Sequence, residues 1–152
     1  MARLLAQRGF SLIELAVAVA VAGIIAAIAY PSFQQHVIRT RRTEGQGALQ
    51  ALMQQQERYF TQNNRYIAFA PGASDPDAQQ FRWWSGTSAA YSAYEIEAKA
   101  CDDEDIADCV QLVATPGTER VDRHYRDATC DRLTLTSTGL RQASGPGPRC
   151  WR

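Results

Sequence analysis

The sequence predicts an α+β domain in which one long, kinked N-terminal helix packs on a three- or four-stranded antiparallel sheet. Two observations carry this prediction. A helical hydrophobic pattern continues from Ser11 to about Thr61, and alternating apolar and polar residues, typical of strands, follow in the C-terminal half. The length of 152 residues fits one small domain, and the formal net charge of zero gives no overall polycation that would indicate nucleic-acid binding.

The predicted helix begins as an uninterrupted apolar run. From Leu15 to Ile38, 24 residues, the sequence contains no Lys, Arg, Asp or Glu. At about 1.5 Å of rise per residue, this run is long enough to cross a hydrocarbon layer of about 30 Å. Pro31 lies inside the run, and we expect a kink there, because proline removes one backbone N–H and clashes with the preceding turn.

The second half of the predicted helix is amphipathic. Apolar residues recur at helical spacings, namely Ala48, Leu49, Leu52, Met53, Tyr59 and Phe60. The opposite side is polar and consists of Gln46, Gln50, Gln54, Gln55 and Arg58. Asn63 and Asn64 are the expected stop signal.

Three segments after the helix have strand patterns. Tyr94, Ile96 and Ala98 alternate with charged residues, residues 110–115 are β-rich, and Leu133 and Leu135 precede a Ser-Thr-Gly turn at 137–139. Residues 70–90 are rich in Pro, Gly, Ser and Ala and are predicted to form a loop. An apolar insert in this loop consists of Phe81, Trp83 and Trp84, and we expect its two tryptophans to pack against the domain rather than to stack on a ligand.

The start of the apolar run carries a carboxylate, Glu14, and is preceded by Arg3 and Arg8. A secretory signal peptide is one interpretation, because Ala27-Ile28-Ala29 resembles its cleavage site. A charge costs about 2.5 to 3.5 kcal/mol at the centre of a membrane helix and less near its end, so an intramembrane carboxylate usually has a function. Glu14 therefore favours an anchor that is retained.

The stretch Arg8-Gly9-Phe10-Ser11-Leu12-Ile13-Glu14-Leu15 resembles the type IV prepilin signature. The resemblance implies that a prepilin peptidase and methyltransferase cuts between Gly9 and Phe10 and N-methylates Phe10. It also implies that Glu14 assists docking into a filament. The expected organisation is a leader peptide at 1–9, a transmembrane or filament-core helix at 10–33 and an exported globular pilin domain at 34–152.

The C-terminal stretch "CDRLTLTSTGLRQASGPGPRCW", residues 130–151, resembles the cysteine-bounded end of PilE-like minor pilins. The two resemblances imply a non-enzymatic subunit of a type IV pilus, minor rather than major, without a cofactor. Its expected partners are other pilin subunits and the inner membrane, which it spans once before it moves to the pilus at the cell surface. A pseudopilin of a type II secretion system and a DNA-binding pilin remain alternatives, and the role of the filament in motility, adhesion or DNA uptake stays open.

Four cysteines lie in the C-terminal third and allow three disulfide connectivities. An even number of cysteines beyond a membrane-type segment indicates an oxidising compartment, which places the C-terminal part outside the inner membrane. Sequence proximity and the resemblance favour the pairs Cys101–Cys109 and Cys130–Cys150.

An acidic loop lies between the first two cysteines, with carboxylates at Asp102, Asp103, Glu104, Asp105 and Asp108. Oxygen ligands suit Ca²⁺, but the spacing is not that of an EF-hand and the loop has no glycine turn. A solvated acidic loop is therefore the preferred interpretation and no metal site is predicted, although calcium binding stays an open alternative.

Enzymatic motifs are missing from the sequence, since it contains no G-x-S-x-G, H-E-x-x-H or P-loop pattern. Basic residues do gather around Tyr125, namely Arg120, Arg123, His124, Arg126 and Arg132. Asp122, Asp127 and Asp131 interleave with them, so we expect a salt-bridged surface rather than a track for DNA phosphates. DNA is accordingly the weaker candidate partner.

Overall fold

The computed structural model describes residues 11–151, and its first element is the long helix α1 (Leu12–Asn63). The observed helix agrees with the predicted one to within two residues at either end. The chain divides into two compact units, and the boundary between Val37 and Ile38 lies a few residues beyond Phe33, the expected end of the membrane segment. The helix continues through Pro31 without ending, and a bend at that residue stays a prediction.

The C-terminal end of α1 is closed by asparagine, as expected. Asn64 has a left-handed backbone with φ of 54°, and its N–H donates to the Phe60 carbonyl at 2.7 Å. Asparagine tolerates this conformation better than most residues, and the hydrogen bond satisfies a carbonyl that has no partner inside the helix.

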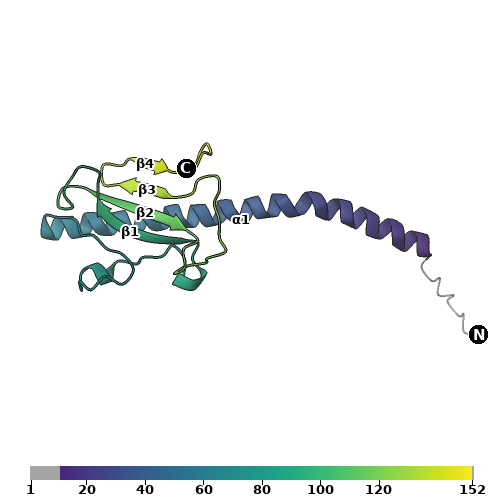
Figure 1. Ribbon diagram of the computed structural model, residues 1–152, viewed down its shortest axis with the longest axis horizontal. Coiled ribbons are helices and arrows are strands. Elements are labelled where there is room, and N and C mark those ends of the chain that lie inside the picture. The colour runs from purple at the N-terminus through teal and green to yellow at the C-terminus, as the bar shows by residue number, and fades with distance from the viewer. Residues whose placement is uncertain (1–10, 152) are drawn as a thin grey trace, which may run out of the picture. The chain divides into compact units, whose positions relative to one another are not determined.

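Four antiparallel strands follow in the order β1-β2-β3-β4, so each strand pairs with the next along the chain (Figure 1). They are β1 (Tyr94–Ala100), β2 (Val110–Pro116), β3 (Leu133–Thr136) and β4 (Arg141–Ala143). The register pairs Ala98 with Leu112 and Leu112 with Leu135. The three predicted strand segments are confirmed, and the short edge strand β4 completes the sheet.

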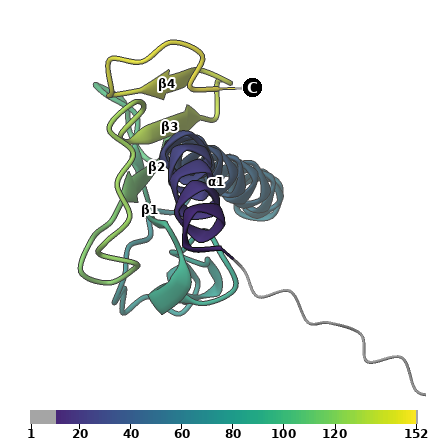
Figure 2. The same cartoon turned by 90° about the vertical axis from the view of Figure 1, so that its right-hand side faces the viewer.

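The sheet lies on one side of the globular half of α1 (Figure 2), and the core fills the space between them. Leu49 of α1 and Tyr94, Ile96 and Leu112 of the sheet are completely buried. Gly45 permits this close approach, because a Cβ atom at that position would lie only 2.8 Å from Cδ2 of Tyr94. The absence of a side chain at Gly45 thus determines how near the helix packs to the first strand.

Two glutamines of α1 are buried, and one of them corrects the sequence analysis. Gln46, expected on the polar side, is 6% exposed and its Nε2 donates to the Cys150 carbonyl. Gln56 is 0% exposed, and its side-chain amide exchanges two hydrogen bonds with the backbone of Ile67, at 2.7 and 3.1 Å. Loops that close over the helix therefore turn part of its polar side into interior, where each amide finds a backbone partner.

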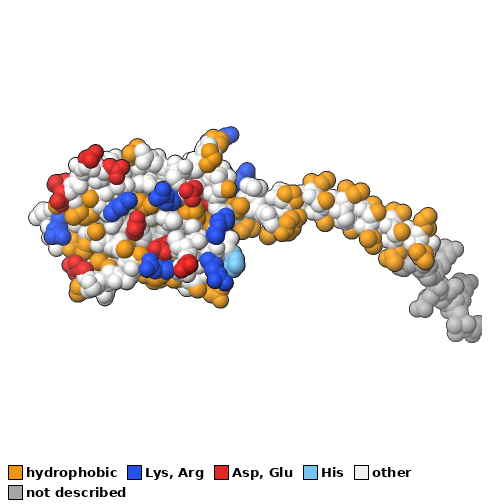
Figure 3. Space-filling model, in the orientation of Figure 1, with side chains coloured by type: hydrophobic (Ala, Val, Ile, Leu, Met, Phe, Trp, Pro, Cys, Tyr) orange, Lys and Arg blue, Asp and Glu red, His pale blue; other side chains and the backbone are white. Residues whose placement is uncertain are grey.

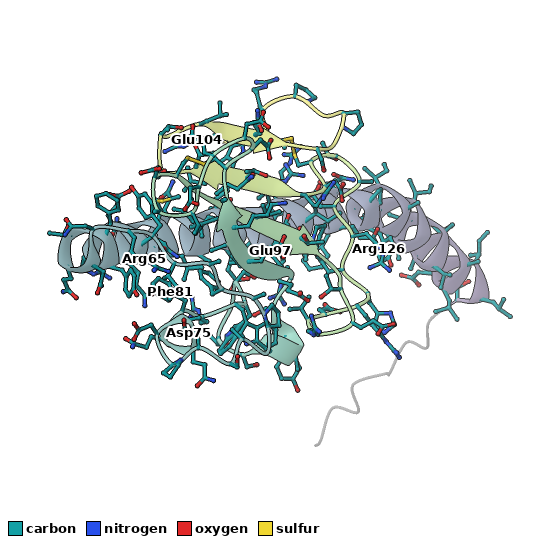
Figure 4. The ribbon with its side chains drawn as sticks, turned by 60° about the vertical axis from the view of Figure 1, so that its left-hand side comes forward. Arg65, Asp75, Phe81, Glu97, Glu104 and Arg126 are labelled. Atoms are coloured by element: carbon teal, nitrogen blue, oxygen red, sulfur yellow. A yellow bond between two sulfur atoms is a disulfide. The ribbon has the colours of Figure 1, made fainter. Side chains whose placement is uncertain are left out.

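The loop between α1 and β1 contains two short 3-10 helices, η1 (Ala78–Gln80) and η2 (Ala89–Tyr91). Phe81, labelled in Figure 4, is 4% exposed and stacks on Phe69 with ring centroids 5.1 Å apart. Trp83 packs against the core. The ring of Trp84 contacts the ring of Trp83 edge-on, with centroids 5.1 Å apart. The packing role expected for Trp83 is confirmed, and Phe81 belongs to the core as well.

Candidate functional site

The predicted cleavage and methylation site, Gly9 and Phe10, lies outside the described residues. Glu14 lies in the first turn of α1 and is exposed. Along this part of the helix the apolar side chains are exposed, as Leu12 at 85% and Ile28 at 71% show. Figure 3 shows these apolar side chains along the helix.

The apolar half of α1 meets the length and composition criteria for a membrane span. Among the described residues, this helix is the one candidate, with an 18-residue window of mean hydropathy 2.6. None of that window is buried within the chain. Such a surface suits an apolar environment, because exposed apolar area costs about 25 cal/mol per Å² in water.

The four cysteines form two disulfides, Cys101–Cys109 and Cys130–Cys150, which are the two pairs expected from the sequence. The first closes the acidic loop between β1 and β2. The second closes the segment that contains β3 and β4, and Cys130 is completely buried. The Cys150 carbonyl also accepts a hydrogen bond from Gln46, so the segment closed by this second disulfide is connected to α1.

A buried ion pair joins α1 to the segment before the second disulfide. Arg42 donates from Nε and Nη2 to the two carboxylate oxygens of Asp127 at 2.6 and 2.7 Å. The Asp127 side chain is 0% exposed and that of Arg42 is 12% exposed. The same carboxylate accepts the N–H of Cys130 at 3.1 Å and the hydroxyl of Tyr94 at 2.9 Å. One aspartate therefore links the helix, the first strand and the start of the disulfide loop.

The protonation of this network follows from its surroundings. Burial by itself raises the pKa of the Asp127 carboxyl. The hydrogen bond from Arg42, and after it the one from the Cys130 N–H, lower this pKa by more than burial raises it, so it lies below its ordinary value. Burial also raises the pKa of Tyr125 to about 12 and that of Tyr94 well above its usual range. At neutral pH the aspartate is thus ionised and both phenols stay protonated, as the hydrogen bonds require.

This network was missed by the sequence analysis, which placed Asp127 among carboxylates that would neutralise neighbouring arginines. In the structure Asp127 pairs instead with Arg42, 85 residues away in the sequence. Asp122 accepts the backbone N–H of His124, and Asp131 accepts the hydroxyl of Ser144.

The expectation of a locally salt-bridged surface is therefore wrong for most of residues 120–132. Arg120 does form an ion pair, with Glu95 at 3.4 Å. Within residues 11–151, Arg123, Arg126 and Arg132 form none, and all three are exposed. Of the carboxylates that alternate with them, Asp127 is neutralised by Arg42, whereas Asp122 and Asp131 accept hydrogen bonds from uncharged groups and keep their negative charges.

The acidic loop is open to solvent and organised by its own contacts. Asp102 accepts from Gln111 at 3.1 Å, and Asp105 accepts the N–H of Ala107 at 2.8 Å. Over the described part of the chain, His, Cys, Asp and Glu side chains form no group of three or more placed to hold a metal ion. The geometry adds no argument for calcium here.

The sequence and the structure of this chain are similar to those of known pilins. The family model described as "Type IV minor pilin ComP, DNA uptake sequence receptor" matches residues 31–134, and that of the "Prokaryotic N-terminal methylation motif" matches residues 4–30. A type IV pilin structure from Shewanella oneidensis, 22% identical, aligns with 76% of this chain and 98% of its own at a TM-score of 0.46.

Two curated relatives are also pilins. The type IV major pilin protein PilA of Myxococcus xanthus is 37% identical over 94 residues, which are 62% of this chain and 43% of that protein. A fimbrial protein of Pseudomonas aeruginosa is 31% identical over 112 residues, 74% of this chain and 70% of that protein. The chain thus spans less than half of the Myxococcus relative but most of the Pseudomonas one.

The minor-pilin model covers more than half of the chain, and the methylation motif covers the segment directly before it. The Pseudomonas relative is 31% identical over 74% of this chain. The chain therefore belongs to the type IV pilin family and carries a ComP-like minor pilin domain.

Proposed function

We propose that this protein is a non-enzymatic structural subunit of a type IV pilus, held in the inner membrane by a single span before it enters the filament at the cell surface. The observation that carries the proposal is the uncovered apolar surface of α1 from Leu12 to Val37. Lipid would cover this surface before assembly, and the apolar helices of neighbouring subunits would cover it afterwards. The match to a minor-pilin family favours a type IV pilus over a secretion pseudopilus.

Processing follows the same proposal. A prepilin peptidase and methyltransferase removes the leader at residues 1–9 and methylates Phe10, which leaves residues 10–33 as membrane and filament-core helix and residues 34–152 as the exported domain. Support comes from the methylation motif matched at residues 4–30. A free or methylated α-amino group at Phe10 stays protonatable, so the mature chain begins with a positive charge.

Glu14 is the proposed docking residue. A carboxylate in an apolar environment needs a partner, and the proposed N-terminus at Phe10 lies only four residues before Glu14 in the sequence. In a filament, the N-terminus of an axially displaced neighbour would offer the same positive charge. Attraction in low dielectric is strong and little screened by salt, which makes this pair suited to selecting a subunit position.

The experiment is intact-mass analysis and N-terminal sequencing of sheared filaments from cells that express the chain. The proposal expects the protein in the filament fraction, with Phe10 methylated at its N-terminus. A mature chain that starts at Tyr30, as signal peptidase cleavage after Ala29 would give, contradicts the anchor, the filament role and the role of Glu14 together.

A second candidate function, DNA capture by the filament, is favoured by one specific observation. The matching family is described as a DNA uptake sequence receptor, and Arg123, Arg126 and Arg132 are exposed and form no ion pair among the described residues. Arginine charges of this kind bind backbone phosphates with strong salt dependence.

The test of this second function is binding of the full chain, in detergent, to duplex DNA over a range of salt concentrations. Each arginine that contacts a phosphate contributes about 0.9 to the slope of log K against log salt. Replacing Arg123, Arg126 and Arg132 with glutamine should lower that slope, whereas Arg65→Gln at the opposite end of the domain should not. Equal slopes for both variants and the unmodified chain contradict DNA binding by this cluster.

A further inference from the structure

Residues from separate segments meet where α1 enters the globular unit. Arg41 of the helix donates from Nη1 to the Tyr91 carbonyl at 3.0 Å, and the Tyr125 hydroxyl donates to the Ile38 carbonyl at 3.3 Å. The loops that contain the two tyrosines therefore surround the first turn of α1 in this unit. Tyr91 itself is 74% exposed, although it is held in place by this contact.

The charge on this face is positive and largely unpaired. Arg39 and Arg123 are exposed, and neither forms a salt bridge within residues 11–151. Arg126 bonds through Nη1 to three backbone carbonyls, at 2.7, 2.7 and 3.3 Å, which fixes its position without neutralising it. Arg42 differs, because the buried Asp127 neutralises its charge.

Two carboxylates face the same region and reduce its charge without cancelling it. Glu44 forms a salt bridge with Arg41 at 3.4 Å, and both side chains are about a third or more exposed. Asp122 accepts a hydrogen bond from the backbone N–H of His124. Figure 3 shows Lys and Arg side chains (blue) at several places on the visible face of the globular unit, with Asp and Glu side chains (red) among them. Figure 4 places Arg126 on the side where α1 enters the globular unit and Arg65 at the far end.

The chain connects this face directly to the proposed membrane span. If residues 10–33 fill the hydrocarbon layer, residues 34–38 rise about 7.5 Å along the helix. The interfacial layer on each side of a bilayer is about 5 to 8 Å thick. Arg39 and Arg41 follow the proposed span by only six and eight residues along the chain, so this connection alone keeps headgroup phosphates within their reach. An exposed tyrosine beside them suits the aromatic belt typical of membrane interfaces.

From this placement we propose that the basal patch, formed by Arg39, Arg41, Tyr91, Arg123 and Arg126, binds anionic phospholipid headgroups while the subunit is held in the membrane. The inference rests on the proposed function, since it needs α1 to be embedded in a bilayer. Anionic lipid is favoured over DNA as the occupant at this stage, because the anchor places headgroups beside the patch, whereas DNA must arrive by diffusion. Entry into the filament would then remove the patch from the lipid surface and expose it.

The experiment is hydrogen exchange of the full mature chain in nanodiscs, made either of phosphatidylcholine alone or of phosphatidylcholine mixed with phosphatidylglycerol. Amides of residues 88–92 and 120–126 should exchange more slowly in the anionic discs, by about fivefold for each arginine engaged. Added salt should remove the difference, because it screens exposed charges. The Arg39→Gln/Arg123→Gln variant should lose about fivefold of the lipid dependence for each of the two arginines that engages lipid, whereas Arg58→Gln/Arg65→Gln, two exposed arginines near the end of α1, should keep all of it.

Several results would overturn the basal patch. These are equal exchange in the two lipids, a lipid dependence that is undiminished in Arg39→Gln/Arg123→Gln, or protection of the same amides by duplex DNA in neutral discs without any protection by anionic lipid. The last result would assign the face to DNA alone. A chain that fails to enter the discs contradicts the proposed anchor itself, so the two failures are distinguishable.

Discussion

Replacement of Asp127 by asparagine probes the contact by which α1 is attached to the disulfide loop. The substitution keeps the shape of the side chain but removes the charge that faces Arg42. In the native structure the carboxylate accepts four hydrogen bonds, two from Arg42 and one each from Tyr94 and Cys130. An asparagine turns an N–H₂ donor toward one of these donors and leaves a guanidinium that is only 12% exposed without its counter-ion.

The expected cost is about 3 to 5 kcal/mol, the usual effect of removing one partner from a buried ion pair. Asp131→Asn is the matched control, because this exposed carboxylate accepts a single hydroxyl, and its loss should cost less than about 1 kcal/mol. The Arg42→Met/Asp127→Asn double variant should be more stable than Asp127→Asn alone, since no unpaired charge remains buried.

The assay is urea unfolding of the full chain in mild detergent, followed by tryptophan fluorescence. The reasoning requires Asp127→Asn to lower the free energy of unfolding by several times more than Asp131→Asn. A loss of less than about 1 kcal/mol for Asp127→Asn would show that the ion pair barely exceeds its desolvation cost and does not secure the loop.

Three further outcomes follow from the same structure. Gly45→Ala should lower stability by about 1 to 3 kcal/mol in the unfolding assay, because its Cβ would press on the Tyr94 ring, and an unchanged midpoint would contradict the close packing. Loss of the Cys130–Cys150 bridge, which closes a 20-residue separation, should cost about 3 kcal/mol; peptide mapping under non-reducing conditions that joins Cys109 to Cys130 would refute the pairing. Because its folded pKa is lowered, Asp127 contributes stability that is fully present above about pH 4 and is lost as pH falls through the folded pKa, so acid unfolding of Asp127→Asn should show a shallower dependence.

Local periodicity predicted most of the architecture. The helix from Ser11 to about Thr61 and the alternation at Tyr94, Ile96 and Ala98 are patterns written in neighbouring residues, and the structure has both elements at those positions. The Gly9-Phe10 site and its relation to Glu14 came from a motif, which the methylation model also matches at residues 4–30.

Contacts between distant segments were not predictable in the same way. Gln46 belongs to a polar stripe, yet its partner carbonyl lies 104 residues further on. Asp127 has arginines on both sides in the sequence, but the folded chain brings Arg42 to it instead. Pattern and composition cannot show which of several candidate cations a buried carboxylate takes, because the choice depends on how the loops close over the helix.

The central claim is that the uncovered apolar helix enters a filament and that Glu14 directs this entry. Its most direct test is the amount of Glu14→Gln protein in sheared filaments relative to the inner membrane, measured by quantitative mass spectrometry beside the unmodified chain. The account predicts a cleaved, folded and membrane-held variant whose filament-to-membrane ratio falls steeply, since the substitution removes the attraction to a neighbouring N-terminus and makes the anchor itself less costly in lipid. An unchanged ratio with normal piliation would contradict it, because a generic anchor performs equally well or better once its charge is removed.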